Sequence, residues 1–331
     1  MLDQKDLITL KKGDIVKHFF LVKKCDIRTA KSNKQYLSLE LADKTFTIAS
    51  NVWDNFDSFF ENIKNGDVVF ITGFMEEYQG SPQIRITNIR FAEPADNIEP
   101  SDFMEKSARD LEEMKNEFFN RMESVSNSKL KALLKLVFDE DNFKKFSYAP
   151  AGKAWHHSYI HGLLEHTLEI IKICDLMCDI HSEINRDLLI SGAMMHDFGK
   201  TEELSFDSAF EYTDKGKLIG HIVISAMKIN EEAKKIPGFP EELKDCLIHL
   251  ILSHQGKLEY ASPVVPKTME AIVLYHADEL SAKTNAYKRA IQSGTINDNK
   301  WTKFISLAAT DLFNHGISSV TEEEINKSLF D

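Results

Sequence analysis

Cysteine is scarce in this sequence, with four residues among 331. None of the four belongs to a CxxC pair of the kind that is typical of zinc-binding loops. Cys174 and Cys178 are one helical turn apart in the apolar stretch IIKICDLMCDI, and we expect them to pack in a core. The pattern favours reduced thiols, as in a cytoplasmic protein.

Long apolar runs are also missing. No run reaches the roughly 18–20 residues that a membrane-spanning helix needs. The N-terminal stretch MLDQKDLITLKKGD lacks the apolar core of a signal peptide. Because 43% of the residues are hydrophobic and 28% are charged, the composition suits two folded domains. We therefore expect a soluble, cytoplasmic protein without a membrane partner.

Positive charge is in deficit over the whole chain, whose formal net charge is −12. This balance argues against a protein that coats nucleic acid by bulk electrostatic attraction. Residues 1–50 differ, because they hold ten lysines and arginines against six acids, a balance of +4 that leaves −16 for the remainder. A local basic patch can still bind a phosphate backbone.

The first ninety or so residues read as strands. A long extended run, IVKHFFLVKKCDIRT, precedes the alternating stretches YLSLELAD and KTFTIASNVW. A short helix is expected at 55–67, followed by two strands around the turn YQGSP. Five strands with one helix between the third and the fourth are the order of an OB-fold β-barrel.

From residue 103 onward the pattern becomes helical, with apolar residues at three- and four-residue spacing. The expected fold is multidomain α and β: a five-stranded OB-fold barrel followed by an all-α bundle. The predicted parts are an OB-fold domain at 1–92, a linker at 93–102, a helical bridge at 103–150, an all-α domain at 151–315 and a C-terminal helix at 316–331.

Histidines and aspartates stand on or at the ends of separate apolar helices in the second half. Burying so many imidazoles and carboxylates is costly unless a shared cation compensates them. Donors of this kind without thiolates suit Mn²⁺, Fe²⁺, Ni²⁺ or Zn²⁺, and geometry would choose among them. The ion that we expect first is Mn²⁺, with Fe²⁺, Ni²⁺, Co²⁺, Mg²⁺ or Zn²⁺ as alternatives. The candidate ligands are His166, His196, Asp197, His221, His254 and Asp278.

The order His166, His196-Asp197, Asp278, with HDFGK after an apolar helix, resembles the HD phosphohydrolase superfamily. The expected barrel together with GLLEHTL, HDFGK, GHIVIS and SHQGKLEYASPVVP resembles the YhaM-type 3′-to-5′ exoribonucleases over nearly the whole chain. The resemblance implies a helical domain that binds one or two divalent metal ions. It also implies hydrolysis of single-stranded RNA, and of single-stranded DNA as a further substrate, to nucleoside monophosphates by a homo-oligomer.

The resemblance also implies roles for individual residues. His166, His196, Asp197 and Asp278 would bind a first metal, and Asp197 would bridge to a second that is held by His221 and His254. Asp197 and Lys200 would be catalytic, with Lys200 facing the scissile phosphate. This chain departs from the family pattern at Gln255, where many members have a second histidine, and at Ser281, where many have an acid. Both departures weaken the expectation of a second metal.

Further residues are candidates for substrate contacts. His157 and His161 precede the first ligand, and Gln255 follows His254, so all three lie near the expected metals in the chain. OB-folds bind single strands with basic and aromatic side chains, although about half of the side chains in a strand point into the core. The barrel candidates are Phe19, Lys23, Lys24, Arg28, Tyr36, Trp53 and Tyr78.

Two other functions fit parts of the sequence. The helical domain could hydrolyse free nucleotides or a cyclic dinucleotide, with the barrel as a docking module. The chain could also be a single-strand-binding protein with an inactive helical domain, although an intact set of buried ligands argues against this. Metal content separates the last function from the others, and dependence on substrate length separates the first two.

Overall fold

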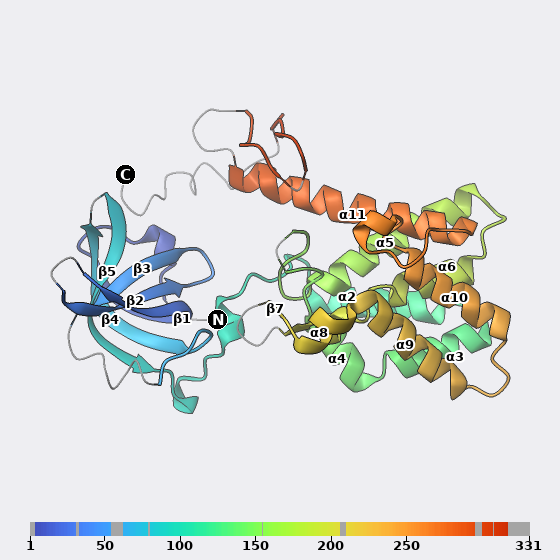
Figure 1. Ribbon diagram of the computed structural model, residues 1–331, viewed down its shortest axis with the longest axis horizontal. Helices are drawn as coiled ribbons and strands as arrows, with labels where there is room; N and C mark the ends of the chain where they lie inside the picture. Colours follow the sequence, from blue (N-terminus) through green and yellow to red (C-terminus); the bar gives the residue numbers. More distant parts are fainter. Residues whose placement is uncertain are drawn as a thin grey trace. The chain divides into compact units, whose positions relative to one another are not determined.

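The computed structural model divides the chain into two compact units (Figure 1). Among the described residues, those through Glu105 form the first unit and those from Lys106 onward form the second. The helix expected at 55–67 lies for the most part outside the described residues, and its described part, residues 62–67, forms turns instead of a helix. The helix expected at 316–331 lies outside the described residues except for residue 316. None of the described helices has the length and apolar character of a membrane span. The structure describes residues 4–30, 33–53, 62–78, 80–153, 155–205, 210–294, 300–306 and 308–316.

The first unit contains a closed β-barrel. Its strands pair in the order β1-β2-β3-β5-β4, antiparallel except for a parallel pairing of β3 with β5. Closure leaves no free strand edge, as in OB-folds. The five-stranded barrel predicted from the sequence is confirmed. The strands are β1 (Ile15–Thr29), β2 (Gln35–Ala42), β3 (Thr47–Val52), β4 (Val68–Tyr78) and β5 (Ser81–Phe91).

Alternation along the strands separates the barrel core from its surface. Leu37, Leu39 and Leu41 of β2 are buried inside, and the side chains between them face outward. In β1 the pairing register with β2 shifts at a bulge between Val22 and Lys24. A bulge changes which side chains of a strand point outward. The outward-facing positions of β1 therefore follow a different alternation before and after the bulge.

The second unit is helical apart from a short pair of strands, β6 and β7. Side chains of Asp110, Asn127, Asp139 and Asn185 accept hydrogen bonds from backbone N–H groups at helix starts, which satisfies donors that the helices leave unpaired. The elements are α2 (Leu111–Glu123), α3 (Ser128–Val137), α4 (Glu140–Tyr148), α5 (Gly162–Ile180), α6 (Arg186–Met195), α7 (Lys200–Glu203), β6 (Leu204–Ser205), β7 (Glu211–Tyr212), α8 (Asp214–Ile219), α9 (His221–Lys234), α10 (Glu241–Ser253) and α11 (Met269–Gly294).

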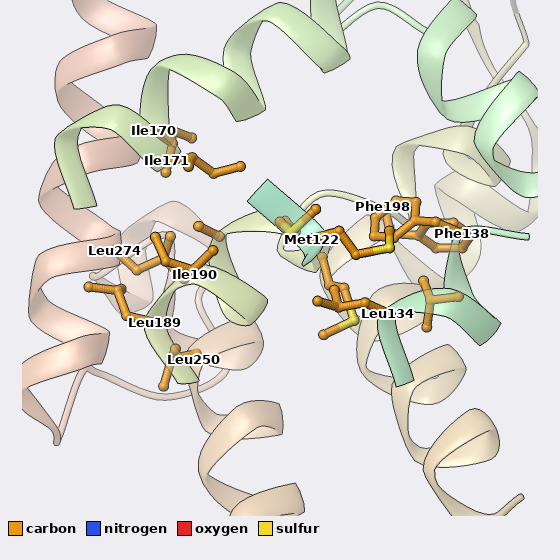
Figure 2. Packing of buried hydrophobic residues seen from close by; sticks show 14 of the residues in the cluster. Met122, Leu134, Phe138, Ile170, Ile171, Leu189, Ile190, Phe198, Leu250 and Leu274 are labelled. Atoms are coloured by element: carbon orange, nitrogen blue, oxygen red, sulfur yellow. The ribbon is translucent and has the colours of Figure 1, made fainter. Parts of the chain in front are cut away.

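Helix α6 occupies the centre of this unit. Every residue from Leu188 to Met195 is buried, as expected for a helix that neighbouring elements surround. Leu189 and Ile190 of α6 lie near Leu250 of α10 and Leu274 of α11 in the core (Figure 2). Because α6 ends at Met195, the next two residues, His196 and Asp197, lie deep inside the helical unit.

A cluster of phenylalanines forms another part of the core. The ring centroid of Phe118 lies 4.9, 5.2 and 5.6 Å from those of Phe138, Phe143 and Phe146. We expect Phe118→Ala to lower the free energy of unfolding of the helical unit by about 3–5 kcal/mol, since it leaves a cavity among these rings. Denaturant unfolding followed by circular dichroism measures the change.

The matched control for this prediction is Phe119→Ala. Phe119 is the next residue along α2, and 40% of it is exposed, so its removal should cost much less. Equal losses in the two variants would contradict the proposed importance of the buried ring.

Candidate metal centre

The six predicted ligands come together inside the helical unit. His166 lies on α5, His196 and Asp197 follow α6, and His221 is the first residue of α9. His254 follows α10 and Asp278 lies on α11. His221 is partly exposed, and the other five are buried. The fold therefore brings together side chains that are more than a hundred residues apart in the chain.

The Asp197 carboxylate stands between two sets of imidazoles. Its Oδ2 atom lies 3.3 Å from Nε2 of His196 and 3.8 Å from Nε2 of His166. Its Oδ1 atom lies 3.4 Å from Nε2 of His221 and 3.6 Å from Nε2 of His254. Asp278 joins the first set, with Oδ1 3.0 Å from Nε2 of His166. Each carboxylate oxygen of Asp197 thus faces a separate group of donors.

Hydrogen bonds on the far side of the rings fix their orientation. Nδ1 of His196 lies 2.8 Å from the Ala193 carbonyl oxygen, and Nδ1 of His254 lies 2.7 Å from that of Ile251. Since a carbonyl only accepts, each Nδ1 donates its proton outward. The lone pair of a neutral ring is then on Nε2, which faces Asp197. This is how histidines are oriented in metal sites.

Several inward-facing atoms have no hydrogen-bond partner in the part of the chain that the structure describes. They are buried, and a buried polar atom without a partner costs about 1–3 kcal/mol. A divalent cation bound between nitrogen and oxygen donors would satisfy them, so the donor set fits a metal centre. The atoms are Nε2 of His166, His196 and His221 and Oδ1 of Asp197.

Lys200 adds a buried positive charge to the centre. Its Nζ atom lies 2.5 Å from Oδ2 of Asp197. Burial alone would lower the pKa of Lys200, but the carboxylates of Asp197 and Asp278 raise it. Burial likewise favours a neutral Asp197, yet Lys200 and His196 hold the pKa of that carboxyl well below its usual value. The ion pair therefore keeps both groups charged in the interior.

Burial lowers the pKa of His166 to about 4, so its imidazole is neutral near pH 7. A neutral imidazole is the form that binds a metal. His156 lies beside this ring, with the two ring centroids 4.9 Å apart, and its pKa is also lowered well below the usual value, chiefly by burial. Both rings are thus neutral and can donate a nitrogen lone pair to a metal ion.

Gly199 in the HDFGK stretch allows a close approach between backbones. A Cβ atom at this position would lie 2.2 Å from the carbonyl oxygen of His221. The Gly199 N–H donates to Oγ of Ser225 at 2.8 Å, which joins the turn to α9. The glycine therefore brings the His196-Asp197 pair next to His221.

The remaining candidates near the centre differ in their placement. His157 is buried, with its Nε2 atom 3.3 Å from Oε2 of Glu169. Nε2 of Gln255 lies 3.4 Å from Nε2 of His254. His161 directly precedes α5 with φ at 70°, and its Nδ1 atom bonds the carbonyl oxygen of Ser147 at 2.6 Å. The His161 side chain thus stabilises the local backbone and lies outside the ligand cluster.

A pocket of about 330 Å³ adjoins the cluster. His254 and Asp278 line its inner side, and aromatic and charged side chains line the rest. Gly256 has φ at 76°, and a Cβ atom there would clash with the ring of Tyr275, so the chain needs glycine at this point. The other lining residues are Trp155, His156, Gln255, Tyr260, Tyr275, Glu279, Ala282 and Lys283.

Comparisons with known proteins match both units. The HD domain model matches residues 163–283, and the model of an OB-fold nucleic acid binding domain matches residues 22–92. A Listeria welshimeri protein named 3′-5′ exoribonuclease YhaM is 32% identical over 87% of this chain and 92% of its own length. Proteins of the same name from Geobacillus sp. and Bacillus subtilis are 32% and 30% identical over 87% and 85% of this chain and 88% of each relative. The chain belongs to the YhaM family.

In the barrel of this YhaM-family chain, Tyr36 and Trp53 form an exposed aromatic pair. Their rings stack with centroids 4.5 Å apart, and 43% of Trp53 is exposed. Arg28 on β1 pairs with Tyr36 in the sheet register. Arg28 and Lys24 both lie within 4 Å of Asp26, at 3.7 and 3.4 Å. Cationic and aromatic side chains thus share one outward face of the barrel.

The other barrel candidates lie elsewhere. Phe19 packs 4.8 Å from Phe70, ring to ring, with the guanidinium of Arg90 over both rings. Burial lowers the pKa of Lys23, whereas Tyr78 at the end of β4 is 60% exposed. Phe19 therefore has a packing role. Tyr78 lies on the surface and is not part of the aromatic pair of Tyr36 and Trp53.

Three residues with contacts to the centre were not singled out from the sequence. Oε1 of Glu203 accepts hydrogen bonds from both the backbone N–H and Nδ1 of His221, at 3.0 and 2.9 Å. Glu169 lies near His157, and His156 lies beside His166. The only signals available were that Glu169 falls one helical turn after His166 and that His156 precedes another histidine.

We expect Asp197→Asn to lower the affinity for Mn²⁺ at least about 100-fold, because it removes the charge that both groups of donors share. Calorimetry on the full chain, with metal content measured after dialysis, would detect the loss. The control is Asp245→Asn, an exposed aspartate on α10. Retention of wild-type affinity by the Asp197 variant would argue against a metal centre at this position.

Proposed function

We propose that this chain is a metal-dependent 3′-to-5′ exoribonuclease that releases nucleoside monophosphates from single-stranded RNA. The observation that carries the proposal is the buried carboxylate of Asp197 between two groups of inward-facing imidazole nitrogens. The relatives named 3′-5′ exoribonuclease YhaM support the polarity and the substrate.

The ligand assignments follow from the two faces of Asp197. His166, His196 and Asp278 would hold one cation with Oδ2 of Asp197, and His221 and His254 would hold a second with Oδ1. The nitrogen and oxygen donors without sulfur suit Mn²⁺, Fe²⁺, Ni²⁺ or Zn²⁺, and we propose Mn²⁺ as the ion to test first. When bound, such cations lower the pKa of a water molecule and neutralise charge on the reacting phosphate.

Lys200 would contribute electrostatic stabilisation. Its ammonium group is held beside Asp197 and is buried, where a charge acts more strongly than in water. A fixed cation at this place would stabilise negative charge that develops on the phosphoryl oxygens during hydrolysis. Asp197 thereby has two functions: it orients the ammonium and it serves as a ligand to both cations.

The pocket beside the ligands would hold the 3′-terminal nucleotide. Its volume of about 330 Å³ and its aromatic lining suit one nucleoside. Tyr260 is half exposed and can stack on a base, and the Gln255 amide next to His254 can donate to the phosphate or the ribose. In this proposal Gln255 contacts substrate, and His157 supports the neighbouring ring of His166.

The barrel would hold the strand upstream of the cleaved end. Stacking on Tyr36 and Trp53 accepts any base, and Lys24 and Arg28 can contact the phosphates. This mode of binding is independent of sequence, as suits an exonuclease that shortens strands of any sequence. It also accepts single-stranded DNA, which is the alternative substrate to be tested.

The decisive experiment uses a 5′-labelled single-stranded RNA with Mn²⁺, comparing the wild type with Asp197→Ala. We expect products that shorten from the 3′ end, with at least about 1,000-fold slower cleavage in the variant, since charge stabilisation by metal ions supplies several kcal/mol. EDTA should abolish cleavage by the wild type.

Other outcomes would point to other functions. Intact RNA with metal-loaded protein would favour a free nucleotide or a cyclic dinucleotide as substrate. Intact RNA with protein that binds no metal would leave a single-strand-binding protein. The same assay on labelled single-stranded DNA measures the preference for ribose over deoxyribose in the substrate.

Trp53→Ala should raise the KM for long RNA about 5- to 150-fold, because stacking of one base contributes about 1–3 kcal/mol. Its effect on kcat for a dinucleotide should be small, since so short a substrate occupies only the pocket. Steady-state kinetics on the two substrates would show the difference. Tyr212→Ala, an exposed aromatic of the helical unit, is the control. An equal effect of Trp53→Ala on both substrates would exclude strand binding by the pair.

We also propose a cytoplasmic location and assembly as a homo-oligomer. The four cysteines are free, which fits a reducing compartment, and RNA is available there. The oligomeric state is a prediction from the family resemblance, and light scattering on the purified chain measures it.

A further inference from the structure

His166 is oriented differently from the other three imidazoles of the centre. The Nδ1 atoms of His196 and His254 bond backbone carbonyls of their own helical turn, and that of His221 bonds a carboxylate directly. Nδ1 of His166 instead lies 2.9 Å from Oγ of Ser281 on α11. A hydroxyl can donate or accept, so by itself it does not fix the proton on the ring.

Glu169 removes this ambiguity. The Ser281 hydroxyl donates to Oε2 of Glu169 at 2.6 Å, and an ionised carboxylate has no proton to give back. With its only proton committed, Oγ of Ser281 can only accept from His166. Nδ1 of His166 must therefore carry the proton, and its Nε2 lone pair faces Asp197 and Asp278.

We propose that Ser281 and Glu169 act together as positioning residues that fix the tautomer and orientation of His166 and so set the affinity of the first cation site. The inference rests on the proposed function, because it takes His166 to be a ligand. Neither residue is expected to touch the reacting phosphate.

The placement of these residues supports a shared role. Glu169 and His166 lie three residues apart on α5, and Asp278 and Ser281 lie three residues apart on α11. Helix α11 thereby approaches both nitrogens of one ring, with Asp278 3.0 Å from Nε2 and Ser281 2.9 Å from Nδ1. Ser281 is buried, so water does not compete for the hydroxyl.

Glu169 also faces a second imidazole. Its Oε2 atom is 3.3 Å from Nε2 of the buried His157. The Oε2 atom of Glu169 thus lies within reach of both the Ser281 hydroxyl and the His157 ring. Loss of Glu169 would thus affect two histidines, whereas loss of the Ser281 hydroxyl would affect one.

The test measures Mn²⁺ affinity of the full chain by calorimetry, independently of RNA cleavage. We expect Ser281→Ala and Glu169→Leu each to raise the Kd of the first cation site about 10- to 100-fold, as for other changes behind a metal ligand. Because the two residues act in series, the Kd of the double variant Ser281→Ala/Glu169→Leu should not exceed the larger Kd of the two single variants.

A rescue variant and a control make the test specific. Ser281→Asp/Glu169→Leu places a carboxylate where it can accept directly from His166, and it should recover affinity to within about threefold of the wild type. Ser191→Ala removes a buried hydroxyl on α6 that has no hydrogen-bond partner among the described residues, and it should leave the Kd unchanged. Thermal unfolding of each variant checks that it folds.

The outcomes are distinguishable. Wild-type affinity in both single variants, or additive losses in the double variant, would overturn the positioning role and leave the metal centre standing. Failure of the rescue variant in a folded protein would also overturn it. If the wild type binds no Mn²⁺, both this inference and the proposed metal centre are wrong.

Discussion

The helical unit depends on how it accommodates one buried carboxylate. Asp197 lies almost completely inside the protein, where an unpaired charge would be costly. The chain surrounds it with Lys200 and with imidazoles on both of its oxygens. These partners lie on α5, α7 and α9 and next to the ends of α6 and α10, so these elements converge on the carboxylate. The packing of the unit and the proposed chemistry therefore have a common origin.

The groups that hydrogen-bond to the candidate ligands are placed as specifically as the ligands themselves. Backbone carbonyls orient two rings, and Glu203 orients a third through both its backbone N–H and its Nδ1. In each case the outer nitrogen donates to the acceptor, so that the lone pair of a neutral ring is on the inner side. These contacts hold donor atoms toward one point before any cation is bound, which is the arrangement that the proposed metal centre would need. In the proposal, a serine and a glutamate from two different helices would orient one further ligand, His166.

Much of the fold and of the candidate site could be predicted from the sequence. The parts that could not be predicted depend on tertiary contacts. Strand alternation predicted the barrel, and helical spacing predicted the second unit. The ligand candidates stood out because polar residues ended apolar helices, and the fold brings them together. Glu203 and Glu169 carry no such signal, since acids on helices are common and only tertiary contacts reveal their partners. Phe19 faces away from the barrel core, but packing against Phe70 could not be read from alternation.

If the proposed cation binds where five helices converge, the stability of the protein would depend on the supply of metal. A ligand that binds only the folded state stabilises that state by mass action. Because α5, α9 and α11 each contribute a donor and α6 and α10 each end at one, a bound cation would join segments that are distant in the chain. Cells short of the metal would then contain less folded nuclease, since proteases remove the unfolded form. RNA turnover would respond to metal supply through the abundance of the enzyme as well as its rate.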